Sequence, residues 1–130
     1  MAVEEDLVAF LEANTAELTA ARIWPSRRPQ KAVVPGLVYQ RIDTPRTHAH
    51  SGPSGLAHPR FQLSCWGRTL AEAAGLAEQV RLAIDGYQGD MGDTYVCGVM
   101  VANEIDDEDI DTGLWRRIVD VIVWHREAVA

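Results

Sequence analysis

The apolar stretch at residues 114–124 constrains the fold more than any other part of the sequence. Val119, Val121 and Val123 alternate there with isoleucine and tryptophan, so an extended chain would be apolar on both sides. β-branched residues favour strands, and a strand that is apolar on both sides is typical of a sheet with two covered faces. We therefore expect a strand with both faces covered.

Four further segments have the composition of strands. The clearest alternates strictly, with Phe61, Leu63 and Cys65 on one side and polar residues on the other, which predicts one buried face. The other three are short apolar runs, and the first of them is stopped by Pro25. With the closing stretch, the expected strands are residues 22–25, 37–42, 60–66, 94–102 and 114–124.

Two segments predict helices. Residues 3–20 place apolar side chains at three- and four-residue spacings, and acidic residues occupy the first turn, where the helix dipole favours them. A second helix is expected over residues 69–84. Thr69 followed three residues later by Glu72 forms a capping box at its start, and Gly86 ends it.

The second helix contains an internal glycine, Gly75. Glycine inside a helix costs about 1 kcal/mol relative to alanine, so we expect close packing of the helix on the sheet at this point to compensate. The apolar stripe of the helix should pack on the sheet through Leu76, Val80 and Ile84.

The order of these elements predicts an α+β fold in a single domain, residues 1–130, with a mainly antiparallel sheet of about five strands covered by two helices. The length suits one hydrophobic core. The composition, with 47% hydrophobic and 24% charged residues, is typical of a globular domain. Cys65 and Cys97 lie in strand-like segments and are expected to be reduced core residues, although the sequence alone also allows a disulfide. His125 is expected at the surface.

The formal net charge of −7 disfavours tight nucleic-acid binding, because that affinity comes largely from Lys and Arg. The acidic N-terminus does not resemble a secretory signal, and no apolar run reaches the ~20 residues that span a bilayer. We therefore expect synthesis in the cytoplasm and no membrane partner.

Residues 43–59 contain three prolines, two glycines and three histidines and show no apolar period. This composition predicts a long hairpin arm that lacks regular pairing, is mobile in the isolated subunit and becomes ordered against a partner. The candidate partner-binding residues in this flexible arm are Arg46, His48, His50 and Leu56. No cysteine or carboxylate lies near the histidines at zinc-ligand spacing, so a metal site is not expected.

Residues 104–113 predict an acidic loop. Asp107, Asp109 and Asp111 reproduce the start of an EF-hand, but a threonine stands at the position of the turn glycine and an isoleucine at that of the bidentate glutamate. We interpret the loop as a solvated connection or a contact for a basic partner, without a metal. Its candidate contact residues are Asp106, Asp107, Glu108 and Asp109.

No nucleophile in a sharp glycine-flanked turn and no phosphate-binding loop is present in the sequence, so no catalytic residue and no cofactor is predicted. Two alternatives to a structural role stay open. One is a small adaptor or regulatory binding domain, and the other is a metal-dependent hydrolase that uses the acidic loop.

Four pieces of the sequence form a pattern in this order: Arg22-Ile23-Trp24-Pro25, residues 35–42 (PGLVYQRI), residues 61–66 (FQLSCW) with the alanine-rich helix that follows, and residues 112–117 (TGLWRR). The pattern resembles the tail-completion or tail-terminator family of long-tailed bacteriophages, prophages and gene transfer agents. The arm and the acidic stretch at 104–111 are not matched to the family pattern.

The resemblance implies a structural virion protein, made in the host bacterial cytoplasm, that forms a homo-hexameric ring at the head-proximal end of the tail. Such a ring stops growth of the tail tube and joins the tail to the head. The implied partners are other copies of the chain, the tail tube protein and a head–tail connector or stopper protein. DNA would pass through the ring without specific binding, and an acidic protein suits that passage.

Overall fold

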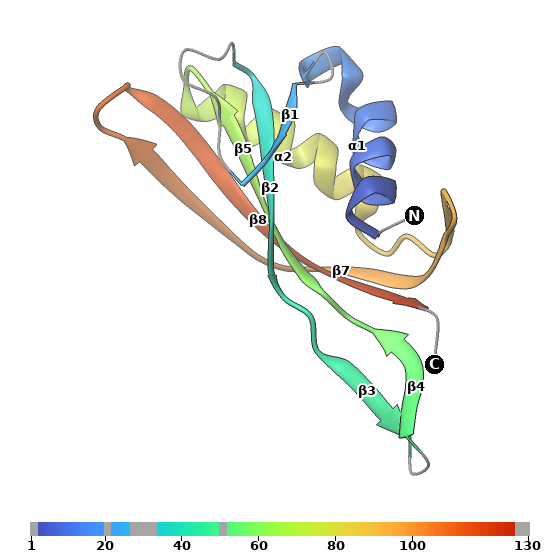
Figure 1. Ribbon diagram of the computed structural model, residues 1–130. Coiled ribbons are helices and arrows are strands. Elements are labelled where there is room, and N and C mark those ends of the chain that lie inside the picture. Colours follow the sequence, from blue (N-terminus) through green and yellow to red (C-terminus); the bar gives the residue numbers. More distant parts are fainter. Residues whose placement is uncertain (1–2, 20–21, 27–33, 50–51, 127–130) are drawn as a thin grey trace.

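The computed structural model describes residues 3–19, 22–26, 34–49 and 52–126. Two helices and an eight-stranded curled sheet form one α+β domain, which confirms the predicted fold class (Figure 1). The helices are α1 (Val3–Thr19) and α2 (Leu70–Ile84). The strands are β1 (Ile23–Pro25), β2 (Gly36–Asp43), β3 (Arg46–Ala49), β4 (Gly52–Ala57), β5 (Arg60–Gly67), β6 (Gly89–Met91), β7 (Thr94–Asp109) and β8 (Leu114–Arg126).

Strand β8 lies at the centre of the sheet. It pairs antiparallel with β5 along one edge and with β7 along the other. Outside β5 lies β2, which carries β1 on its far edge, and outside β7 lies the short β6. The strand predicted over residues 114–124 is therefore confirmed, and it is the central strand of the sheet. The sheet is antiparallel as predicted except for β1, which runs parallel to β2.

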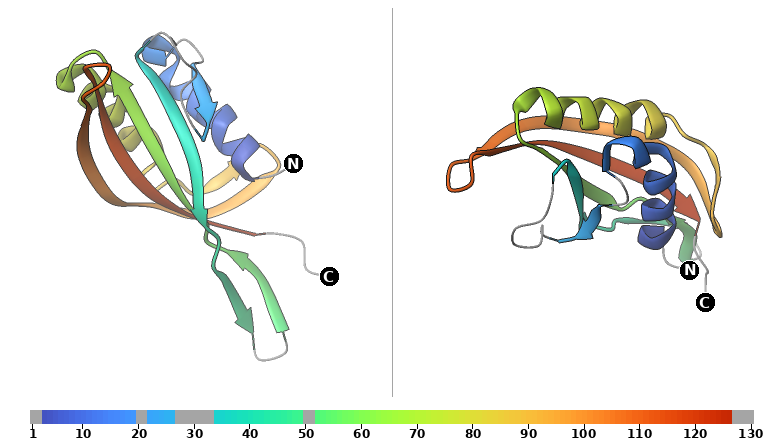
Figure 2. Two further views of the ribbon diagram at one scale, coloured as in Figure 1. Left: turned by 60° about the vertical axis from the view of Figure 1, so that its left-hand side comes forward. Right: turned by 90° about the horizontal axis from the view of Figure 1, so that it is seen from above.

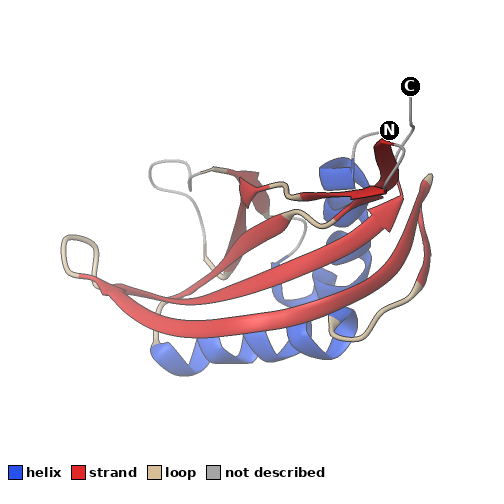
Figure 3. Ribbon diagram, turned by 90° about the horizontal axis from the view of Figure 1, so that it is seen from below, coloured by secondary structure: helices blue, strands red, loops and turns tan. Residues whose placement is uncertain are grey.

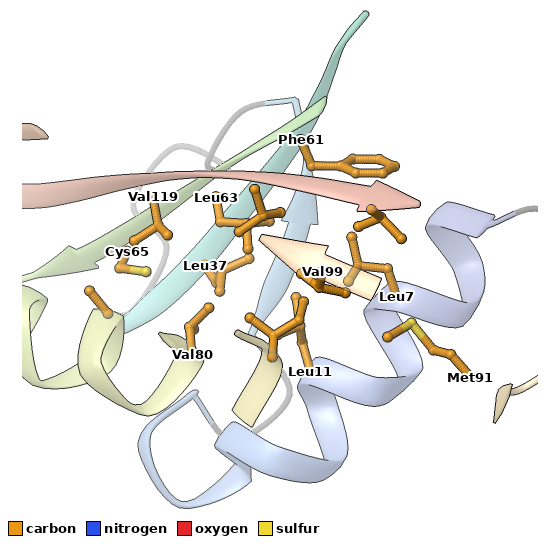
Figure 4. Packing of buried hydrophobic residues seen from close by; sticks show 14 of the residues in the cluster. Leu7, Leu11, Leu37, Phe61, Leu63, Cys65, Val80, Met91, Val99 and Val119 are labelled. Carbon is orange, nitrogen blue, oxygen red and sulfur yellow. The ribbon is translucent and has the colours of Figure 1, made fainter. Parts of the chain in front are cut away.

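The two helices pack together on one face of the sheet (Figure 3). Leu7 and Leu11 of α1 meet core residues of the sheet that include Leu37, Leu63 and Val119 (Figure 4). The predicted contact residues of α2, Leu76, Val80 and Ile84, are all fully buried, so that prediction is confirmed. None of the described helices is long and apolar enough to cross a membrane.

The segment 43–59 differs from the prediction, because it contains two paired strands. Strands β3 and β4 form a hairpin that continues the β2–β5 pair outward and extends away from the body of the domain (Figures 1 and 2). Pro53 does not prevent the pairing because it lies beside a register shift, and proline is accepted at bulges and sheet edges. The mobility of this arm stays a prediction.

The sequence predicted that Gly75 packs closely on the sheet, and the structure shows that this prediction is wrong. Gly75 is exposed on the outer side of α2, and a Cβ atom added there would meet nothing within 4 Å. The compensation expected from packing is therefore missing within the described subunit.

His125 is also placed differently from the prediction. It is buried, with 6% of its surface exposed, because the end of β8 pairs with Ala57 of β4 and Val96 of β7. Its Nδ1 atom lies 3.1 Å from the carbonyl oxygen of Arg126.

The two cysteines are free in the structure, as predicted. Cys65 is fully buried among the core residues of β5, whereas Cys97 is partly exposed. Burial, together with the nearby charge of Glu104, raises the pKa of the Cys65 thiol from its ordinary 9.0 to about 12, although Arg117 acts in the opposite direction.

We expect Cys65 to resist thiol reagents at pH 8 in the folded protein, because the reactive thiolate is disfavoured there. Ellman's reagent should modify at most Cys97 before unfolding and both thiols in denaturant. Because the folded pKa is raised, the free energy of unfolding should also fall as pH rises from about 9 towards about 12, and a Cys65→Ser control should lack this component. Rapid labelling of Cys65 in the native protein would contradict the buried placement.

Candidate functional site

The sheet face opposite the helices carries no helix within the described residues, and we call it the open face. Neighbours across a strand pair share a face, and Met100 pairs with Ile122 while Ile105 pairs with Ile118. Met100 and Ile105 are 49% and 51% exposed. These two apolar pairs, with the polar pair Asn103–Asp120 between them, are named here together as the apolar patch (Met100, Ile105, Ile118 and Ile122).

The apolar patch corrects one part of the sequence interpretation. The alternation of β8 predicted two covered faces, but helices cover only the side that carries the valines Val119, Val121 and Val123. Apolar residues on both sides of a strand are equally suited to a face that a partner covers. The apolar residues on both sides of β8 were visible in the sequence, but we had not considered that a partner could cover the second face.

A small second cluster lies on the open face beside the apolar patch. Val38 and Trp66 are buried there, and Trp24 packs against them. Gly36 makes this packing possible, because a Cβ atom at that position would lie 2.6 Å from the Trp24 ring. The guanidinium of Arg116 lies over the Trp66 ring at 5.4 Å from its centroid.

A polar pocket of about 130 Å³ opens next to this cluster. Its lining residues are Ser26, Val38, Gln40, Gln62, Ser64, Trp66 and Arg116. Ser64 is only 4% exposed, yet its hydroxyl has no hydrogen-bond partner among the described residues, and neither do the amides of Gln40 and Gln62. Ser64 is also the direct cross-strand partner of Ile118, so the pocket adjoins the apolar patch.

The acidic stretch is not a loop over residues 104–113, as the sequence had suggested. Its residues up to Asp109 belong to β7, and only the turn at 110–113 lies outside the strands. The register places Asp106 opposite Arg117 and Asp107 opposite Arg116. Opposite charges directly across a strand pair stabilise the pairing, which explains why so acidic a segment is extended.

Each pair is a short ion pair. Nε of Arg117 donates to Oδ1 of Asp106 at 2.7 Å, and Nη2 of Arg116 donates to Oδ2 of Asp107 at 2.9 Å. The hydrogen bond from Arg117 lowers the pKa of the Asp106 carboxyl. Alternation along the strand places the two pairs on opposite faces of the sheet. At the turn, Ile110 is 88% exposed.

The structure separates the predicted partner-binding residues into two groups. Asp106, Asp107, Glu108 and Asp109 lie near the end of the β7–β8 hairpin, while Arg46 and His48 lie on β3 and Leu56 on β4. The arm and this hairpin extend from opposite ends of the domain (Figure 1). His50 lies outside the described residues. Their roles in binding stay predictions.

The third histidine of the arm segment belongs to the body. His58 stacks on Trp124, with ring centroids 4.2 Å apart and planes 16° apart. The contact lies where β4 passes into β5 and fixes the base of the arm against β8.

The sequence model of the tail completion protein gp17 family matches residues 5–126. This chain belongs to the tail completion protein gp17 family. As a tail completion protein it is a structural component of the phage tail and virion, and it is not an enzyme. No curated protein matches the chain.

The fold of this tail completion protein also resembles a chain in the solved structure "Virion of native gene transfer agent (GTA) particle". The two chains superpose with a TM-score of 0.74 at 16% sequence identity, over 96% of this chain and 92% of the other. The fold of this chain is therefore also present in a particle of this kind.

We predict that the acidic hairpin of this tail completion protein does not bind a metal ion. Asp106 and Asp107 are engaged by arginines, and no cluster of three possible ligands occurs within the described residues. Calorimetric titration with calcium, magnesium and manganese should show nothing tighter than roughly millimolar binding. A micromolar site that is lost in Asp107→Ala and Asp109→Ala together would reverse this conclusion.

Proposed function

We propose that this protein forms a homo-hexameric ring that caps the head-proximal end of the tail tube, stops its growth and joins it to the head connector or stopper. Membership of the tail completion family supports the place in the tail. The observation that carries the ring is the open face, on which Met100 and Ile105 are about half exposed beside two further isoleucines.

A sheet face that exposes apolar pairs without a covering helix is a reason to expect a partner. Antiparallel sheets commonly keep one face in water, but that face is then polar in alternation. Here the apolar patch lies beside a polar pocket, and such mixed surfaces occur at interfaces. A closed ring also needs two different complementary surfaces on each subunit, because head-to-tail contacts generate rings.

The charge distribution supports passage of DNA through such a ring. The protein has a net charge of −7, and five of its eleven arginines form ion pairs with carboxylates. The ion pairs in the described residues are Arg41–Glu4, Arg68–Glu72, Arg81–Glu78, Arg116–Asp107 and Arg117–Asp106. The excess of carboxylates over cations repels phosphate, so DNA would move past without specific binding.

The ring is tested by light scattering of the purified protein, alone and mixed with its tail tube protein. We expect a species of about six times the 14.4 kDa chain mass in at least one of the two samples. Particles that lack the protein should show tails of uncontrolled length without heads in electron micrographs. A monomer that does not bind the tube protein would favour the adaptor alternative. Tails of normal length with heads attached, in particles that lack the protein, would contradict capping.

We propose that the arm is a second contact, made with a neighbouring subunit or the tail tube through Arg46, His48, His50 and Leu56. Strands β3 and β4 project from the body of the domain, which gives a partner room to approach them (Figure 2).

A shortened arm tests this contact. Thr47 pairs directly with Leu56, so residues 48–55 can be replaced by an Asn-Gly turn that closes a two-residue hairpin. The buried Ala57 at the base is kept. We expect nearly unchanged melting of the isolated subunit and a clear loss of capped tails or infectious particles. Unchanged assembly would show the outer arm to be dispensable, and a collapsed fold would show that it belongs to the core.

A further inference from the structure

The outer side of α2 has an exposed stripe of residues that the fold itself does not use. Ala71, Gly75, Gln79 and Leu82 recur at helical spacing, and all four are exposed. Leu82 is 64% exposed, and nothing lies within 4 Å of the position where Gly75 would carry a Cβ atom. We call these four residues the α2 stripe.

Gly75 weakens the helix, and no contact within the described subunit offsets this effect. Small residues such as glycine allow the backbone of another element to approach closely. Leu82 next to such a gap provides an apolar anchor. The α2 stripe therefore has the shape expected of a contact surface, but it does not by itself identify the partner.

The polar pocket on the open face supplies an independent observation. Buried polar groups are almost always hydrogen-bonded, yet the buried Ser64 hydroxyl has no partner in the described residues. The amides of Gln62, which is partly buried, and of Gln40, which is exposed, line the same pocket. These groups both donate and accept. The one charged residue in the lining, Arg116, is already neutralised by Asp107. A neutral amide matches this set, because a charged ligand would find no free counter-charge.

We propose that the α2 stripe of one copy docks on the open face of the next copy, with the Gln79 amide in the polar pocket and Leu82 on the apolar patch. This inference rests on the proposed ring and names its interface. Gly75 and Ala71 then let the helix approach the sheet closely.

The spacings of the two surfaces agree. Gln79 and Leu82 are three residues apart, which is about 4.5 Å along a helix axis. Ser64 of the pocket and Ile118 of the patch are direct cross-strand partners, and such residues lie about 5 Å apart. One helical turn therefore spans from the pocket to the patch.

The contact also has the symmetry that a ring requires. The α2 stripe and the open face belong to opposite sides of the domain, because α2 packs on the face that carries Val119 and Val121. A contact between two different surfaces repeats head to tail and can close. Each sheet would then have its own helices on one face and the helix of its neighbour on the other.

Substitutions on the two surfaces test the docking. Leu82→Glu and Ile105→Glu should each reduce the ring fraction at least tenfold, in solution or on tail tubes, without lowering the melting temperature of the isolated subunit. Gly75→Leu should raise the melting temperature, because no neighbour opposes the side chain, and should still disrupt the ring. Ala13→Leu and Ala13→Glu on the exposed side of α1 are matched controls that should leave the ring intact.

Cross-linking tests the pairing directly. In a Cys97→Ser background, Leu82→Cys combined with Ile105→Cys should form disulfide-linked ladders longer than dimers under mild oxidation. The control pair Leu82→Cys with Ile110→Cys should not. Cys65 does not interfere because it is fully buried.

The outcomes separate this inference from the ring itself. If the unaltered protein stays monomeric alone and on tail tubes, the proposed ring is wrong. If it forms a ring and the three disruptive variants assemble as well as it does, without ladders from the cysteine pair, only the docking is wrong. If the disruptive variants lose the ring and the cysteine pair forms the ladder, both the ring and the docking are supported.

Discussion

The pairing of β8 on both of its edges is the constraint on which the rest of this structure depends. β5 and β7 are far apart in the sequence and meet only through this strand. Val119, Val121 and Val123 are all fully buried under the helices, so the same strand also supplies the floor of the core. Loss of its register by one residue would move these valines to the open face and expose them.

The organisation around β8 leaves the two sides of the sheet unequal. The helices cover one side, and within the described residues the other side holds only a small cluster around Trp66. The remaining surface combines isoleucines with hydrogen-bonding groups that lack partners, such as Ser64. A subunit built in this way has a complete core on one side of the sheet, while the other side keeps apolar and polar groups that a partner could cover. That combination is what an assembly component needs.

Sequence periodicity was sufficient for the helices and for most of the strands, because the apolar spacing belongs to each segment itself. It failed where structure depends on a distant neighbour. The acidic end of β7 is extended because Arg116 and Arg117 lie across from it, and the composition of the segment alone suggested a loop. The solvent exposure of Gly75 and the unpartnered hydroxyl of Ser64 were likewise invisible, since both depend on what surrounds them in space.

The arm is attached in a way that affects how force would reach the core. Between the β2–β5 ladder and the β3–β4 ladder the ribbon narrows to two short links, each with a proline, Pro45 and Pro59. Prolines have no N–H group, and across the links the amide of His58 donates to the carbonyl of Pro45 at 3.0 Å. The same junction is braced on one side, because Leu56 and Ala57 of β4 pair with β8 and His58 stacks on Trp124. A load on the arm would therefore pass along β4 into β8, so a partner that pulls on the arm would pull directly on the strand that forms the floor of the core.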